Sequence, residues 1–459
     1  MPGSQTKISD PILTIATWIS VISLLTGPIY WLPGIPITAI SLLKDGLLAL
    51  FVLVMLVRQV LSRDSSFLPF LLLYQGDLFL IGIVFASFGV MNSAEPLASF
   101  LYWARYVLTF GLYFCVYRLL SLSSVHRERL QYLLLLPVFI SVFYMLLVTA
   151  GLFPKIPPPS EFSEGLNQIF GTQIIGFSYR RNVMCQSIAY IWPVCFYHFI
   201  PIARGSTSKF RLIWGFMCLL LFAAAVISTA RGGLLLIVVV SVFGLVLSIR
   251  NARTLLILVS VTTFLSLAIV TVISNSDSLN LYKMIVLRDF SPRKGKRSEA
   301  DNLSSGRVSN YAMGLKLFQE NFVTGIGFGQ FSKIAEDDLD SGRFIHNLYL
   351  SIGVEAGILA AFCIFLFNLW QAVRWTIFVV RNRNQLETSV FVWHGILLIN
   401  FGETFFQPGS MFSALHVALP FWFSIGALCA YKRSYDMKPS ISRPLPPSLG
   451  DESFRTVST

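Results

Sequence analysis

The feature that most constrains this chain is a series of apolar runs, each about 20 residues long, separated by polar segments, most of them short. They lie near 11–28, 36–57, 68–90, 99–117, 130–151, 183–203, 212–230, 232–249, 254–273, 346–370, 387–405 and 411–430. Inside a bilayer no water is present to bond the backbone, so a run of this length must form a helix, which satisfies its own amides. The sequence therefore predicts an all-α integral membrane protein with about twelve transmembrane helices.

The composition agrees with this class. Hydrophobic residues make up 55% of the chain and charged residues only 13%, about half of what soluble domains carry. The 35 Lys and Arg against 23 Asp and Glu give a net charge of +12, which in a soluble protein would suggest a nucleic-acid partner. Here the positive charges lie in the turns between apolar runs, so we expect contact with membrane lipids and no nucleic acid.

Positive residues alternate from one turn to the next, and Lys and Arg of short loops stay on the cytoplasmic side. The turns near 58–63, 118–129, 204–211, 250–253 and 374–383 are rich in arginine, whereas the turns at 29–35, 91–98 and 406–410 contain no Lys or Arg. This predicts that both termini are cytoplasmic and that the long polar segment of about 274–345 lies outside the cytoplasm. All six cysteines fall inside predicted spans, where we expect them to face lipid or to pack.

No soluble domain interrupts the spans, so residues 1–430 are predicted to form a single polytopic transmembrane domain, followed by a disordered, Pro-rich cytoplasmic tail at 431–459. The long loop has a basic front. Its back half places Val308, Tyr311, Leu315 and Phe318 at helical spacing, which predicts an amphipathic helix. The glycines of the segment 325–329 then predict a break.

His346 opens the apolar run that follows this loop. A titratable imidazole at the boundary between water and hydrocarbon, close to arginines, suggests chemistry on an anionic membrane-borne substrate, with His346 as a general base. The alternative is an interfacial histidine with a structural role. A metal site is less attractive because no second histidine lies nearby, so we expect no metal and no cofactor.

Several arginines are candidates for binding a diphosphate, because a planar guanidinium bonds two phosphate oxygens at once. Arg231 lies at a tight outer turn between two apolar runs, and Arg307 precedes the expected amphipathic helix. Arg288, Arg181 and Arg180 are secondary candidates of the same type. The alternative for each is an ordinary solvated or snorkelling arginine.

Ionisable residues also fall inside the predicted spans. Lys44 and Asp45 are adjacent in the second span, and Arg105 lies in the fourth. Such residues face a bundle interior or an aqueous cavity. These residues are compatible with a transport path or with a structural ion pair, and Arg105 also with a further phosphate contact. The sequence does not distinguish these alternatives.

The motifs Ser305-Gly306-Arg307, Gly325-Ile326-Gly327-Phe328-Gly329, His346-Asn347-Leu348-Tyr349-Leu350 and Glu355-Ala356-Gly357, together with Ser228 through Gly233, resemble the signature of the O-antigen ligase and polymerase superfamily. The resemblance is densest over about residues 300–370 and extends to the layout of about twelve helices with one large late outer loop. Its members are multi-span glycosyltransferases, although some cyanobacterial proteins once proposed to move bicarbonate share the pattern.

The resemblance implies that His346 is the essential loop histidine and that Arg231 and Arg307 hold a lipid diphosphate. It implies a metal-independent, inverting transfer of a glycan from undecaprenyl diphosphate to an acceptor sugar hydroxyl, at the periplasmic face of the bacterial inner membrane. The expected reaction is O-antigen ligation to lipid A–core. The alternatives are an O-antigen or exopolysaccharide polymerase and, in a different class, a transporter of small anions such as bicarbonate.

Overall fold

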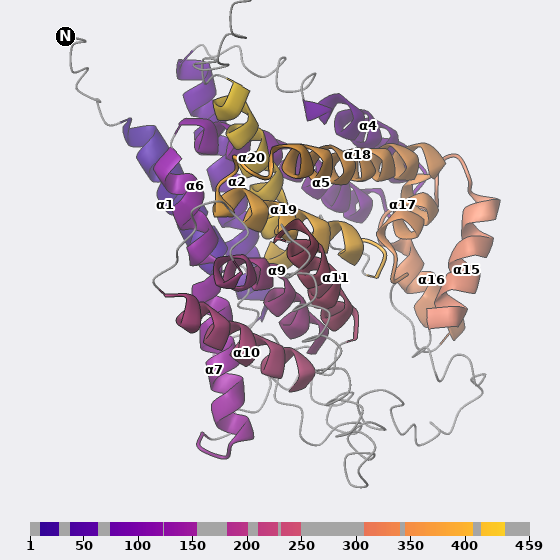
Figure 1. Cartoon of the computed structure of the whole chain (residues 1–459). Coiled ribbons are helices and arrows are strands. Elements are labelled where there is room, and N and C mark those ends of the chain that lie inside the picture. The colour runs from indigo at the N-terminus through magenta and orange to yellow at the C-terminus, as the bar shows by residue number, and fades with distance from the viewer. Residues whose placement is uncertain are drawn as a thin grey trace, which may run out of the picture.

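The computed structural model describes residues 10–26, 37–62, 74–122, 124–153, 181–200, 210–227, 231–248, 307–339, 345–406 and 415–436. Every regular element in these ranges is an α-helix, so the predicted all-α class is confirmed (Figure 1). The helices are α1 (Pro11–Thr26), α2 (Ile37–Leu61), α4 (Gly76–Met91), α5 (Pro96–Leu122), α6 (Ser124–Leu133), α7 (Leu135–Thr149), α9 (Arg181–Phe199), α10 (Arg211–Ile227), α11 (Arg231–Ser248), α15 (Arg307–Glu320), α16 (Gln330–Leu339), α17 (Leu348–Ala356), α18 (Ile358–Asn382), α19 (Thr388–Glu403) and α20 (Leu415–Asp436).

Two helical segments in the described part of the chain are both long and apolar enough to cross a bilayer. They are Arg129–Val148 and Ile358–Asn382, and several shorter apolar helices accompany them. The number of about twelve spans stays a prediction, and the predicted span at 254–273 lies outside the described residues. The tail at 431–459 is described only to the end of α20, which reaches Asp436.

The main core is rich in large aromatic side chains. Trp422 of α20 is fully buried, with its ring 5.2 Å from that of Phe79 in α4 and 5.5 Å from that of Tyr113 in α5. Phe367 of α18 closes the same cluster, 4.9 Å from Phe79. All six cysteines are buried and form no disulfide, so they pack within the protein.

A break at Gly357 divides the apolar run that was predicted as one span over 346–370. The run forms a short helix, α17, and a long one, α18, and Gly357 between them has a φ of 87°. The amide of Ile358 bonds the carbonyl oxygen of Phe322 at 2.9 Å, so the turn after α15 closes over the break. Irregular backbone of this kind is tolerated at membrane depth only where protein covers it.

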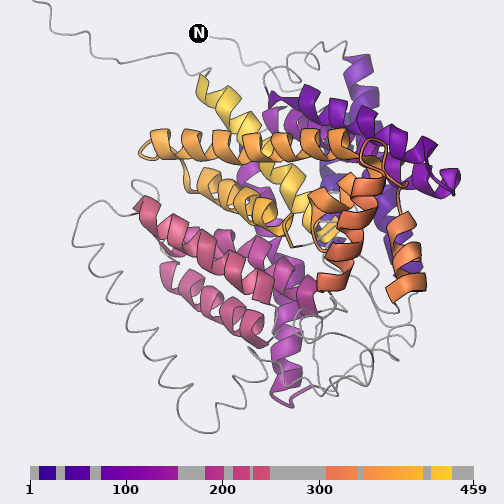
Figure 2. The ribbon, with the colours of Figure 1, turned by 90° about the vertical axis from the view of Figure 1, so that its right-hand side faces the viewer.

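The helices α15, α16 and α17 form a unit at one edge of the bundle, shown at the right of Figure 1 and facing the viewer in Figure 2. We call residues 307–339 and 345–356 the loop unit. It has a small core of its own, made of Phe331, Ala335, Ile345 and Val354. The predicted helix is confirmed as α15, and Tyr311 and Phe318 of its predicted apolar face pack on this core, whereas Val308 and Leu315 are about half exposed. The predicted break is confirmed by the positive φ angles of Gly325, Gly327 and Gly329.

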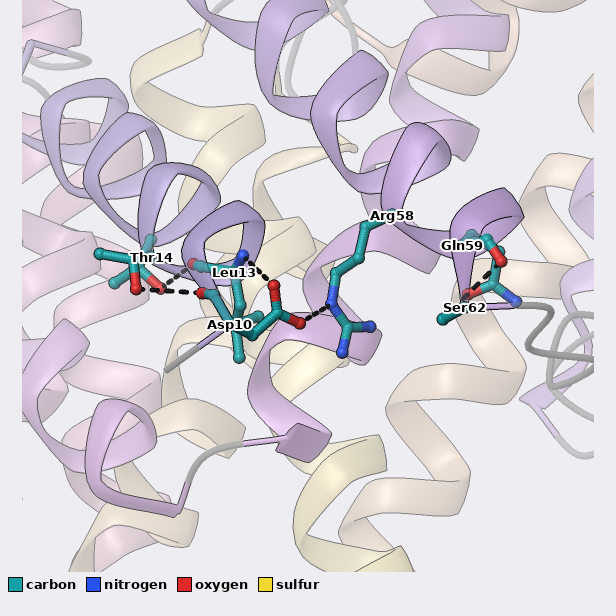
Figure 3. Close-up of polar contacts among 7 residues, drawn as sticks. Asp10, Leu13, Thr14, Arg58, Gln59 and Ser62 are labelled. Carbon is teal, nitrogen blue, oxygen red and sulfur yellow. Dashed lines mark hydrogen bonds and ion pairs between the residues drawn. The ribbon is translucent and has the colours of Figure 1, made fainter. Parts of the chain in front are cut away.

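The opposite end of the bundle carries an ion pair between the first two helices. Asp10 accepts hydrogen bonds from the amide of Leu13 at 3.1 Å and from Nε of Arg58 at 2.7 Å, so it caps α1 and ties it to the end of α2 (Figure 3). At the same end, Arg433 of α20 contacts Tyr117 of α5 at 3.4 Å. Arginines assigned by sequence to cytoplasmic turns therefore lie together.

We expect Gly357→Ala to destabilise the protein. Its φ of 87° and ψ of 169° belong to a region open essentially to glycine, which costs other residues on the order of 1–3 kcal/mol, and a Cβ here would collide with the carbonyl oxygen of Val323. Thermal unfolding in detergent should show a loss of several degrees. Gly46→Ala in α2 is the matched control, because a Cβ there meets nothing within 4 Å. Equal unfolding temperatures for both variants would contradict this account.

We expect the contribution of Asp10 to stability to depend on pH. Partial burial acts to raise the pKa of its carboxyl, but the hydrogen bonds from Leu13 and Arg58 outweigh burial and hold the pKa below the ordinary 3.8. A carboxyl with a lowered pKa stabilises the fold above about pH 4, and this contribution disappears as the pH falls through the folded-state pKa. The wild type should therefore exceed Asp10→Asn in unfolding temperature at pH 7 by a margin that shrinks below pH 4. The pair is partly exposed, so the effect should not exceed about 1 kcal/mol.

Candidate active site

His346 lies immediately before α17, on a stretch of backbone held from both sides. The amide of Asn347 bonds the carbonyl oxygen of Ile345 at 2.8 Å, which makes a tight turn centred on His346. The hydroxyl of Tyr311 donates to the carbonyl oxygen of His346 at 2.7 Å. The side chain of Asn347 then caps α17 by accepting from the amide of Leu350 at 2.9 Å. The backbone that carries the imidazole is therefore fixed, and the residue is partly buried.

The start of α17 is attached to the end of α19. The amide of Leu348 bonds the carbonyl oxygen of Thr404 at 2.8 Å, and the hydroxyls of Tyr349 and Thr404 are 2.9 Å apart. The side-chain amide of Asn368 in α18 donates to the Tyr349 hydroxyl at 3.1 Å. The helices α18 and α19 thus hold the first turn of α17.

Buried polar contacts join the end of α19 to the start of α9. The side-chain amide of Gln186 donates to Glu403, whose residue is only 2% exposed. The side-chain amide of Asn400, one turn earlier in α19, donates to the hydroxyl of Tyr190 at 3.1 Å. The two helices therefore run antiparallel. Sequence reasoning did not single out this group, and its only signal was an acidic residue, Glu403, near the end of an apolar run.

The helix α11 lies parallel to α9. A Cβ at Gly233 would collide with Cys185, and the indole of Trp192 donates to the hydroxyl of Ser241 at 2.8 Å. The two first turns are therefore neighbours. Arg231 is the first residue of α11, so its backbone lies beside the start of α9 and near the end of α19.

The helix α15 runs alongside α17 in the same direction. A Cβ at Gly314 would meet the side chain of Ile345, and one turn later Phe318 packs against Gly353. Arg307 is the first residue of α15. Gly314 follows Arg307 by seven residues, so α15 begins about 10 Å, or two helical turns, beyond this contact.

The starts of α9, α11 and α17 thus gather around the end of α19. A helix N-terminus carries a partial positive charge, of about half an elementary charge, and unpaired amide groups, so it attracts anions. In α17 the amides of Leu348 and Leu350 are already bonded. The start of α17 therefore places the histidine.

Some predicted site residues are described only in part or not at all. The backbones of Arg231, Arg307 and Arg181 open α11, α15 and α9, but their side chains lie outside the described structure. Arg180 and Arg288 lie outside the described residues. No group of three His, Cys, Asp or Glu side chains that could hold a metal ion occurs among the residues that the structure describes.

Arg105 lies away from His346. Its guanidinium bonds Asp45 at 3.0 Å and stands 5.8 Å from the ring centroid of Tyr102. Tyr102 contacts the Gly329 position, and the amide of Gly329 bonds the carboxylate of Glu355, at the end of α17. His346 precedes the other end of that helix, about 13 Å away along its axis. The structure therefore does not bring Arg105 to the histidine.

Comparison with known proteins gives a match over part of the chain. A family model described as O-antigen ligase matches residues 216–365. A search of the curated proteins finds no match. The matched segment runs from within α10 to within α18 and contains Arg231, Arg307 and His346, whereas α9 and α19 lie beyond it. By this match, residues 216–365 are similar to the O-antigen ligase family, which confirms the resemblance predicted from the sequence motifs.

Proposed function

We propose that this protein is a metal-independent inverting glycosyltransferase that moves a glycan from undecaprenyl diphosphate to an acceptor sugar hydroxyl. Ligation of O-antigen to lipid A–core is the reaction that we favour. The observation that supports it most is that α15, which begins with Arg307, holds the backbone of His346 through Tyr311, in a segment that also contains Arg231 and matches the O-antigen ligase model.

In this mechanism His346 takes the proton from the acceptor hydroxyl, and the freed oxygen attacks the anomeric carbon. The bond from that carbon to the diphosphate oxygen breaks, the configuration inverts, and negative charge grows on the leaving undecaprenyl diphosphate. Arg231, Arg307 and the helix starts stabilise that charge. General-base assistance is typically worth about 10²–10⁴-fold, and stabilisation of the leaving group a similar or larger factor.

We further propose that the site faces the periplasm from the inner membrane and that both termini are cytoplasmic. Arg58 and Arg433 lie at the end of the bundle away from His346, and positively charged short turns are retained in the cytoplasm. The glycan of the donor then lies outside the membrane, and its lipid tail lies among the helices.

A polymerase would use the same donor, base and arginines, so it remains the second candidate within the same reaction class. The transporter alternative needed Lys44, Asp45 and Arg105 as a path through the bilayer. Asp45 and Arg105 are instead 3.0 Å apart and bonded to each other, which supports a structural ion pair. We therefore do not retain transport as a proposal.

His346→Ala is expected to abolish glycan transfer at an unchanged protein level, because the acceptor hydroxyl loses its base. The assay is a lipopolysaccharide gel of a deletion strain that carries each variant, and chelators should not inhibit the purified wild type. His198→Phe is the control: it removes another imidazole, one stacked on Trp214 at the far end of α9, and should retain transfer. Full transfer by His346→Ala would falsify the assignment. In the deletion strain, uncapped lipid A–core with accumulated lipid-linked polymer indicates a ligase, and capping with one repeat indicates a polymerase.

Arg231→Lys and Arg307→Lys should each lower the transfer rate by about 10–100-fold, even though the positive charge is kept. An ammonium does not bond two phosphate oxygens in the planar fork of a guanidinium. Rates with purified donor and acceptor measure the effect. Arg381→Lys, at the exposed last turn of α18, is the control and should transfer at the wild-type rate. If both site variants match this control, the diphosphate role of these arginines is wrong.

A further inference from the structure

The two faces of α17 pack against different groups of residues. Leu348, Ile352 and Ala356 belong to the main core of the bundle. Ile345 and Val354 belong to the small core of the loop unit. His346, just before α17, therefore lies at the boundary between the two cores.

Each side of this boundary supplies one hydrogen bond to the backbone around His346. From the bundle, the carbonyl oxygen of Thr404 accepts the amide of Leu348 at 2.8 Å. From the loop unit, the hydroxyl of Tyr311 donates to the carbonyl oxygen of His346 at 2.7 Å. The ring of Tyr311 packs against the small core, so its hydroxyl extends from a side chain that is already held in place.

Tyr311 also connects the histidine to the expected diphosphate site. It follows Arg307 by four residues in α15, so the two positions lie on the same face of that helix, one turn apart. A displacement of the start of α15 is therefore passed to the carbonyl of His346 through one helical turn and one hydrogen bond.

We infer that Tyr311 is a positioning residue that couples diphosphate binding at the start of α15 to the placement of His346. This inference rests on the proposed function. A base displaced by about 1 Å can cost on the order of 10²-fold in rate, so a residue that holds the base without touching the substrate affects turnover and not donor binding. The hydroxyl of Tyr311 fixes the backbone of His346, and the donor, by ordering α15, holds that hydroxyl in place.

The test compares Tyr311→Phe with Tyr435→Phe in the full-length protein. Both variants lose only a hydroxyl, and that of Tyr435 bonds Asn382 at 3.2 Å at the far end of the bundle. We expect Tyr311→Phe to lower kcat about tenfold, as expected for the loss of one hydrogen bond, with a donor KM within twofold of the wild type and an unchanged unfolding temperature. Tyr435→Phe should keep the wild-type kcat. The double variant that carries Tyr311→Phe and Arg307→Lys should show a smaller fold loss in kcat than the product of the fold losses of the two single variants, because both residues act through α15.

A second measurement does not require transfer. Adding undecaprenyl diphosphate should slow amide hydrogen exchange over residues 345–350 in the wild type and less in Tyr311→Phe. The inference is overturned if Tyr311→Phe has the same kcat as Tyr435→Phe, or if its loss of rate is matched by a loss of thermal stability. Neither result contradicts the proposed function. A different result, glycan transfer retained by His346→Ala, would contradict the proposed function itself.

Discussion

The bond between the amide of Leu348 and the carbonyl of Thr404 is the contact on which the rest of the site depends. It fixes the start of α17 to the end of α19, which is itself held by Gln186 and Tyr190 of α9. Because α11 lies parallel to α9, the starts of α9, α11 and α17 are neighbours around this attachment point. The positive ends of several helices then face the same region, which favours a negatively charged group there.

Local patterns in the sequence predicted the parts of this structure that depend on nearby residues. The spacing of Val308, Leu315 and Phe318 predicted α15, and the glycines of 325–329 predicted the break after it. His346 and Arg307 were singled out by their chemistry and by the boundary on which they lie. Contacts between residues far apart in the chain were not predicted, because the spacing of neighbouring residues carries no information about them. Glu403 and Tyr311 became meaningful only when the fold placed them beside Gln186 and His346.

The division of the run 346–370 shows where reasoning from hydrophobicity fails. An unbroken apolar stretch reads as one helix, because window averages respond to polarity and not to backbone conformation. Gly357 interrupts the helix through its φ of 87°. The interruption leaves no unbonded amide at Ile358, because the carbonyl oxygen of Phe322 accepts its hydrogen bond. The charged residues Asp45 and Arg105 show the opposite case. From the sequence they were compatible with a transport path, but in the structure they bond each other.

The turn after α15 is interlocked with the end of α17. The amides of Ile326 and Gly327 bond the carbonyls of Val354 and Glu355, each at 2.9 Å, and Ile358 returns a bond to Phe322. Segments joined in this way cannot be exchanged piecemeal between relatives. A chimera between relatives should therefore carry the stretch from Phe322 through Ile358 as one block, since a junction inside it would join the turn after α15 of one parent to the end of α17 of the other.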